Sequence, residues 1–161
     1  MTKRIPSPHR PRVLAPIERV AGLDYDVLDE LLGYSLRRAQ VAIFHSFYEA
    51  TRGLGVTPPR FTAMVVVGAN PGISQSTLGS VLGIARSGAM TLTDWFEARG
   101  WVERRRAPSD GRAWGLHLTP RGEKLVAGMK RRVAEGDLKR AASLTAKERR
   151  ELLRLLGKLA G

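Results

Sequence analysis

The residues of this chain best suited to chemistry are cationic side chains that stand close together late in its middle third. Arg104, Arg105 and Arg106 are consecutive, and the turn sequence Pro108-Ser109-Asp110-Gly111 separates them from Arg112. Guanidinium groups carry a fixed fork of N–H donors that matches phosphate oxygens and guanine edges. Three adjacent arginines often form only a solvated surface. The turn beside them and the helices predicted upstream favour contact with nucleic acid instead.

Two short helices are predicted before this basic stretch. Ser74 can cap the first, which should run to about Leu82. Gly83 suits the tight turn of a helix-turn-helix, because glycine takes positive φ without strain. The second helix is expected to run from about Arg86 to Arg99. The side chains expected at the DNA surface of these helices are Ser74, Gln75, Arg86, Ser87, Met90 and Thr91.

A hairpin should follow the second helix, which Gly100 is expected to end. Residues 101–106 have strand character, residues 108–111 form the turn, and apolar residues alternate over residues 114–118. Thr119-Pro120 then opens another helix. Helix, turn, helix and a basic hairpin make a winged helix-turn-helix, so the fold is predicted to be mainly α with a small β wing. In that fold the second helix lies in the major groove of DNA and the hairpin reaches the adjacent groove or phosphates.

The run V-x-R-x-x-x-P-x-D-x-R-x-x-x-L-x-L-T-x-x-G, from Val102 to Gly122, resembles the wing of MarR-family transcriptional regulators. The likeness extends over roughly Asp24 to Leu159. It implies that the wing aspartate, here Asp110, orients a wing arginine, here Arg112, that enters the minor groove. Many relatives carry R-S-T-V-T-R in the recognition helix, and this chain departs from that pattern over Arg86–Thr91, which includes Gly88.

Composition supports a polyanionic partner. The 161 residues include 27 Lys and Arg against 15 Asp and Glu, which gives a formal net charge of +12. The chain has no cysteine, so disulfides, thiol switches and cysteine zinc sites are excluded. No apolar run is long enough to span a membrane and no secretory signal is recognisable, which predicts a cytoplasmic protein. The three histidines lack metal-ligand spacing, so we expect neither an enzyme nor a metal or other cofactor.

Four segments are predicted along the chain. Residues 1–23 form a basic, proline-rich arm, which is interpreted as a tail without fixed structure, as extra phosphate contacts or as a segment packed on a partner subunit. Residues 24–56 form an N-terminal dimerisation helix, which should start at Asp24 or Asp26 and reach about Arg52. Residues 57–122 form the DNA-binding domain, and residues 123–161 the C-terminal dimerisation helices. The wide apolar stripe of the first long helix indicates a subunit interface, and the resemblance implies a homodimer.

Local signals also bear on the C-terminal helices. The sequence Thr145-Ala146-Lys147-Glu148 matches a capping box that opens the last helix. Three glycines, Gly122, Gly128 and Gly136, are expected to weaken the helix that follows Pro120, each by roughly 1 kcal/mol relative to alanine.

The resemblance further implies a small-molecule effector that binds between the dimerisation helices and the winged module. Typical effectors of the family are aromatic acids, and some members respond to aromatic acyl-CoA thioesters. The candidate ligand-binding residues are Arg37, Arg38, Phe44 and His45, although His45 could equally be a hydrogen-bonded interface histidine and the two arginines a solvated surface. The chain is therefore predicted to be a ligand-responsive repressor that binds a pseudo-palindromic operator as a dimer. The alternative is a non-specific architectural DNA-binding protein that responds to no effector.

Overall fold

The computed structural model describes residues 15–107 and 110–161, with the backbone alone described for Ala107 and residues 110–113. Contacts divide the chain into two compact units, one of Gly53–Arg131 and one of residues 15–52 with Arg132–Gly161. Most of the predicted N-terminal arm (residues 1–14) and the predicted turn residues Pro108 and Ser109 lie outside the described residues.

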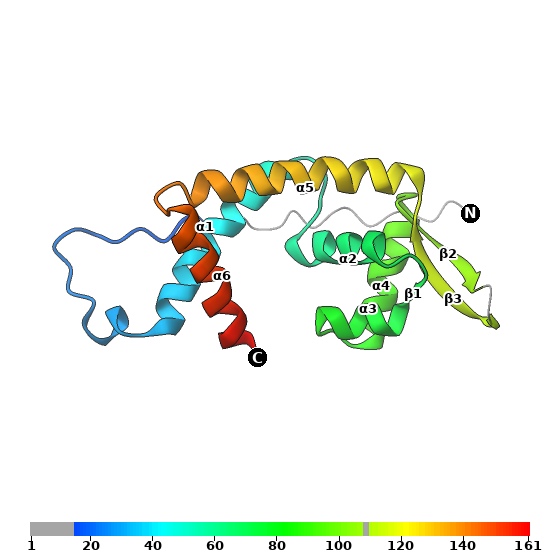
Figure 1. Ribbon diagram of the computed structural model, residues 1–161, viewed down its shortest axis with the longest axis horizontal. Coiled ribbons are helices and arrows are strands. Elements are labelled where there is room, and N and C mark those ends of the chain that lie inside the picture. Colours follow the sequence, from blue (N-terminus) through cyan, green and yellow to red (C-terminus); the bar gives the residue numbers. More distant parts are fainter. Residues whose placement is uncertain (1–14, 108–109) are drawn as a thin grey trace, which may run out of the picture. The chain divides into compact units, whose positions relative to one another are not determined.

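The first unit contains three short helices and the first half of a long one. These are α2 (Pro58–Ala69), α3 (Gln75–Leu82), α4 (Arg86–Glu97) and the start of α5 (Pro120–Arg140), and Figure 1 shows α2, α3 and α4 clustered beside the strands. Thr57 precedes α2 in extended conformation, Pro58 is the first residue of the helix, and the Thr57 side chain makes no capping hydrogen bond. The fully buried side chains that join the elements of this unit are Met64, Val67, Leu78, Ala89, Phe96, Leu116 and Met129.

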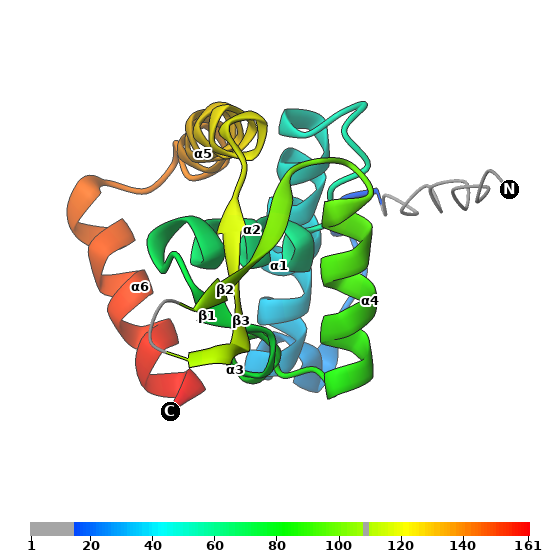
Figure 2. The same ribbon diagram turned by 90° about the vertical axis from the view of Figure 1, so that its right-hand side faces the viewer.

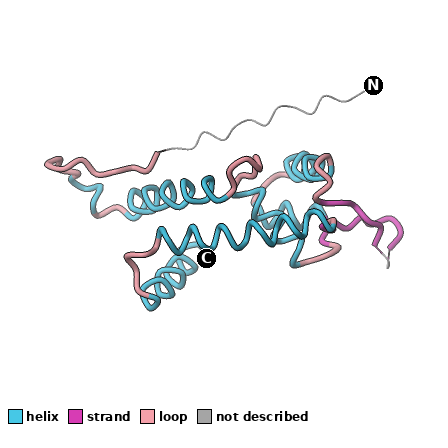
Figure 3. The backbone as a smooth tube through the Cα atoms, turned by 90° about the horizontal axis from the view of Figure 1, so that it is seen from above, coloured by secondary structure: helices cyan, strands magenta, loops and turns pink. Residues whose placement is uncertain are grey.

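All described strand residues belong to one antiparallel sheet of order β1-β3-β2. The sheet is magenta in Figure 3. Its strands are β1 (Ile73–Ser74), β2 (Val102–Ala107) and β3 (Asp110–Leu118). The hairpin register pairs Val102 with Leu118 and Arg104 with Leu116. Figure 2 shows the hairpin strands in front of α2 with α4 beside them, in agreement with the contacts of β3 with α2 and of β2 with α4. The two-residue strand β1 was not predicted from the sequence.

A close backbone contact fixes the base of the hairpin. The Thr119 N–H donates to the Trp101 carbonyl at 3.1 Å, and the Thr119 hydroxyl donates to the Gly100 carbonyl at 2.7 Å. That hydroxyl also accepts from the Gly122 N–H at 3.0 Å, so Thr119 caps α5 as predicted. A Cβ added to Gly122 would stand 2.0 Å from the Trp101 oxygen. The expectation that alanine would be preferred at Gly122 is therefore wrong, because tertiary contact outweighs helix propensity there.

The second unit consists of helices from both ends of the chain. It contains η1 (Asp26–Asp29), α1 (Leu32–Ala50), the end of α5 and α6 (Ala146–Ala160). The prediction that one helix starts at Asp24 or Asp26 is wrong, because Asp26 has a φ of +45° and Leu31 is extended before α1 begins. The predicted capping box of α6 is confirmed, since the Thr145 and Glu148 side chains each accept from the other residue's N–H. No helix of the described residues is both long and apolar enough to cross a membrane.

Replacing Gly122 by alanine should test the contact with Trp101. Gly122→Ala is expected to lower the free energy of unfolding by about 2 kcal/mol or more, because the added methyl group meets backbone that cannot rotate away. Gly128 is the matched control, since a Cβ there would meet nothing within 4 Å. Gly128→Ala should raise the free energy of unfolding by about 0.5–1 kcal/mol. Urea denaturation of both variants measures the difference, and equal effects would contradict the contact.

Candidate nucleic-acid interface

The helix-turn-helix is held together by a cap, a turn and a close helix crossing. The Ser74 hydroxyl accepts from the Thr77 N–H at 3.0 Å and so caps α3 as predicted. Gly83 follows α3 with a φ of +63°, which confirms the predicted left-handed turn. A Cβ on Gly79 would lie 3.3 Å from the Ala89 Cβ, so a glycine lets α3 and α4 approach closely. These three features determine which face of α4 turns outward.

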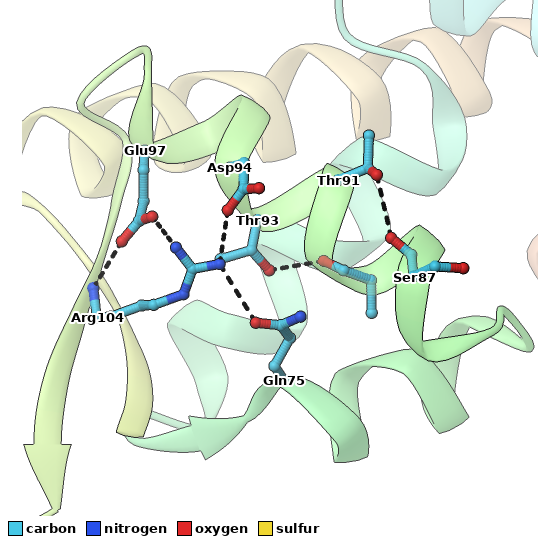
Figure 4. Close-up of polar contacts among 8 residues, drawn as sticks. Gln75, Ser87, Thr91, Thr93, Asp94, Glu97 and Arg104 are labelled. Carbon is cyan, nitrogen blue, oxygen red and sulfur yellow. Dashed lines mark hydrogen bonds and ion pairs between the residues drawn. The ribbon is translucent and has the colours of Figure 1, made fainter. Parts of the chain in front are cut away.

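Helix α4 has one buried face and one exposed face. Ala89, Thr93 and Phe96 are buried, and the buried Thr93 hydroxyl donates to the Ala89 carbonyl at 2.8 Å. The side chains predicted to face DNA lie on the opposite face and are all exposed: Arg86, Ser87, Met90 and Thr91. The Thr91 hydroxyl donates to the Ser87 carbonyl at 3.0 Å, which leaves its oxygen lone pairs available as acceptors (Figure 4). This face offers a cation, two hydroxyls and a thioether, a set that can contact phosphates and base edges.

Arg104 connects three elements of the motif (Figure 4). From β2, its guanidinium donates to Glu97 and to Asp94 of α4, the latter at 2.8 Å, and to Gln75 of α3 at 3.3 Å. Its backbone N–H also donates to the Glu97 carboxylate, at 3.2 Å. The sequence run of three arginines did not reveal this role. Arg104 and Gln75, both predicted to contact DNA, are engaged in fixing α4 against the hairpin.

The next two arginines of the wing have different surroundings. Arg105 is exposed and forms an ion pair with the neighbouring Glu103. Arg106 is exposed, and its guanidinium carbon lies 5.5 Å from the centre of the Trp114 ring, which is itself 51% exposed. Both arginines therefore remain accessible to an external phosphate.

The predicted pair Asp110 and Arg112 cannot be placed at the side-chain level. Both residues belong to β3, and Asp110 pairs with Ala107 of β2. Their side chains lie outside the described part of the structure, so the predicted interaction between them stays a prediction.

The four predicted ligand-binding residues all lie on α1, in the second unit. Arg37 is exposed and Phe44 is 37% exposed, while Arg38 donates to the Ile17 carbonyl at 3.4 Å and lies 5.7 Å from the Tyr34 ring centre. Of the four, His45 lines a cleft whose volume is about 470 Å³. The other lining residues come from α1, the residues just after it and the end of α5: Ser46, Glu49, Ala50, Arg52, Arg132, Glu135, Gly136, Lys139 and Arg140.

The cleft carries more cations than anions. The Arg140 guanidinium donates to the Ser46 hydroxyl at 3.4 Å across it. The hydrogen bond from Arg52 lowers the pKa of Glu49, and the charge of His45 lowers it further. Among the described residues no group of His, Asp and Glu side chains is arranged to hold a metal ion.

Comparison with known proteins identifies the family. The sequence model of the MarR family matches residues 54–113. A transcriptional regulatory protein described for the hcr operon of Thauera aromatica is 36% identical, over 80% of this chain and 78% of that protein. The chain belongs to the MarR family. It is a winged helix-turn-helix transcriptional regulator, which binds DNA and is not an enzyme.

Solved structures of the transcriptional repressor CouR resemble this MarR-family chain over most of its length. The structure of CouR on a 23-mer DNA duplex superposes with a TM-score of 0.80 at 35% identity, covering 86% of this chain and 99% of that one. The structure of CouR with p-coumaroyl-CoA gives a TM-score of 0.75 at 33% identity, covering 86% and 97%.

Arginine at position 104 should be needed for the structure of the motif, whereas its neighbour should not. Arg104→Ala is expected to lower the free energy of unfolding by about 1–3 kcal/mol, because Asp94 and the partly buried Glu97 carboxylate both lose their guanidinium partner. Arg105→Ala should change it by less than about 0.5 kcal/mol, since exposed ion pairs contribute little. Thermal unfolding of the two variants compares them directly. Equal stability would show that the Arg104 contacts do not hold α4 in place.

Proposed function

We propose that this protein is a repressor that binds a pseudo-palindromic operator as a homodimer. The observation that carries the proposal is the exposed face of α4, where Arg86, Ser87, Met90 and Thr91 stand outward from a buried opposite face. The exposed Arg105 and Arg106 add charge on the hairpin. In this proposal α4 lies in the major groove, and the hairpin, with Arg112, contacts the adjacent groove or the phosphates.

Uncovered apolar surface supports the homodimer. Helix α6 has no buried residue in the single chain. Its leucines at positions 152, 153, 155, 156 and 159 are between 38% and 66% exposed. Residues 17–36 expose further apolar side chains: Ile17, Val20, Leu23, Val27, Leu28, Leu31, Leu32 and Leu36. Apolar surface of this extent is typical of a subunit interface. A symmetric dimer would present two copies of α4 about one turn of DNA, roughly 34 Å, apart, so each operator would contain two related half-sites.

A small aromatic acid or its CoA thioester is proposed as the effector that releases the operator. Two observations support this: the similar repressor CouR has been solved with p-coumaroyl-CoA, and the cleft beside His45 is rich in cations, which suit an anionic ligand. An effector that binds the DNA-incompetent state more tightly than the competent one shifts the population away from the operator. Arg37, Arg38, Phe44 and His45 remain the proposed effector contacts.

Operator binding should be specific and strongly dependent on salt. We expect DNA from upstream of the protein's own gene to bind at least about 10³-fold more tightly than scrambled DNA of equal length. Each phosphate contact should add roughly 0.9 to the slope of log affinity against log salt concentration. Arg112→Ala should weaken operator binding by about 1–3 kcal/mol if this arginine enters the minor groove. Fluorescence anisotropy at several salt concentrations measures all three quantities.

The same assay distinguishes the alternative function. Equal affinity for native and scrambled DNA, with no release by aromatic acids or their CoA thioesters, would favour a non-specific architectural protein. Scrambled DNA controls for the electrostatic term, because it carries the same phosphates. An unchanged affinity of correctly folded Arg112→Ala would remove that residue from the interface.

The dimer should separate when charge is placed on α6. Leu153→Glu combined with Leu159→Glu is expected to convert a particle of twice the 17.7 kDa chain mass into one of the single chain mass, because it buries carboxylates in the proposed interface. Val81→Glu is the matched control, since Val81 is also exposed (54%) but lies on α3 in the first unit. Light scattering after size-exclusion chromatography gives the masses. A monomeric wild-type protein would contradict the proposal.

A further inference from the structure

Two arginines stack on one tryptophan in the first unit. Arg60 of α2 has its guanidinium carbon 3.8 Å from the centre of the Trp95 ring, and that of Arg99 lies 3.6 Å from the same centre. Trp95 belongs to α4 and meets the buried Trp101 edge-on, with ring centres 5.4 Å apart. Trp95 and both arginines are half-buried. The Arg60–Trp95–Arg99 cluster is therefore a fixed arrangement with an outer surface.

No carboxylate neutralises this cluster among the described residues. Arg60 donates to the Gly55 carbonyl at 2.8 Å and Arg99 to the Trp95 carbonyl at 3.2 Å, both neutral acceptors. Neither guanidinium belongs to an ion pair in the described part of the chain. Burial lowers the pKa of Arg60, and the charge of Arg99 lowers it further, while burial also lowers the pKa of Arg99. Two like charges are thus held close together in a partly desolvated place.

The remaining hydrogen-bonding capacity of the cluster lies at the guanidinium edges. A guanidinium has five N–H donors, and stacking on an aromatic ring occupies its face and not its edge. Each arginine uses one terminal nitrogen in the hydrogen bonds described above. The other N–H donors of the two guanidinium groups therefore remain available around the Trp95 ring.

We propose that the Arg60–Trp95–Arg99 cluster is a binding site for a phosphate group. A phosphate monoester carries close to two negative charges at neutral pH and a diphosphate at least two. Their several acceptor oxygens match two guanidinium forks. A ligand with a single carboxylate would neutralise only one of the two guanidinium charges. The site binds its phosphate independently of the operator function proposed above.

The position of the cluster favours a phosphorylated small molecule over the DNA backbone. Arg86 opens α4, whereas Trp95 lies in its second half and Arg99 follows its end. Helix geometry places the Cα atoms of Arg86 and Trp95 about 13 Å apart along the axis. The end of α4 that carries Arg86 is the one proposed to enter the groove, so the cluster lies away from it.

Calorimetry with inorganic pyrophosphate tests the site in the absence of DNA. The wild-type protein should bind pyrophosphate, and Arg60→Gln and Arg99→Gln should each weaken binding by about tenfold or more, because each loses hydrogen bonds to a charged ligand. Arg99→Lys should bind with intermediate affinity, since it keeps the charge without the fork. Arg131→Gln is the control, as it removes the same charge from an exposed side chain of α5 in the same unit.

Three outcomes distinguish the possibilities. Pyrophosphate binding that the two glutamine variants lose, with the salt slope of DNA binding unchanged, supports the site and a small phosphorylated ligand. Absence of pyrophosphate binding, with a shallower salt slope of DNA binding in Arg60→Gln or Arg99→Gln, supports the phosphate site and assigns it to the DNA backbone. The proposed site is overturned if no protein binds pyrophosphate, or if all variants bind it as the wild type does, and the salt slopes of DNA binding are equal. The cluster then serves only in packing. If one glutamine variant fails to fold, as circular dichroism would show, the other decides between these outcomes, and weakened pyrophosphate binding by Arg99→Lys supports the site.

Discussion

The DNA-binding unit depends on the contact between the backbone of Trp101 and the first turn of α5. At this point the end of α4, the base of β2, the end of β3 and the start of α5 meet. The Trp101 N–H donates to the Phe96 carbonyl at 3.1 Å, and the Trp101 carbonyl accepts from Thr119 at 3.1 Å. Glycine at position 122 allows α5 to pass so close. Because both hairpin strands leave from this junction, its geometry sets the direction of the wing relative to α4.

The side chain of Arg104 also fixes the hairpin relative to α4. It lies two residues beyond the start of β2 and reaches the acidic residues on α4, so the hairpin and the recognition helix cannot rotate independently without breaking charged hydrogen bonds. Neighbouring arginines of β2 thus differ in role, because they lie on opposite faces of the strand. Alternate side chains of a strand face opposite sides, and Arg104 is directed to the motif while Arg105 is exposed and pairs with Glu103.

The sequence predicted the parts of the fold that depend on neighbouring residues. The Ser74 cap, the left-handed Gly83 and the capping box at Thr145 each involve residues within a few positions of one another, and all three are confirmed. The predicted start of the first long helix was wrong, because the acidic residues suggested an N-terminal cap at a position where Asp26 instead takes positive φ.

Features that depend on distant residues could not be predicted in this way. Propensity misjudged Gly122 because its contact, Trp101, lies 21 positions earlier and is reached only through the hairpin. The contact of Arg104 with Gln75 was not foreseen, because the two residues are 29 positions apart in the sequence. Arg60 and Trp95 belong to different helices and likewise meet only in the folded chain.

The distribution of charge along α4 follows from these contacts. Its first turn contains no acidic residue, so the end that carries Arg86 presents no carboxylate to the phosphates of DNA. Both acids of the helix, Asp94 and Glu97, lie in its second half, where the helix dipole disfavours negative charge. Arg104 offsets that unfavourable position by donating to both. One arginine of the wing thereby holds both carboxylates of α4 in ion pairs within the protein. The opposite end of the helix, whose first turn has no acidic residue, remains free to approach a polyanion.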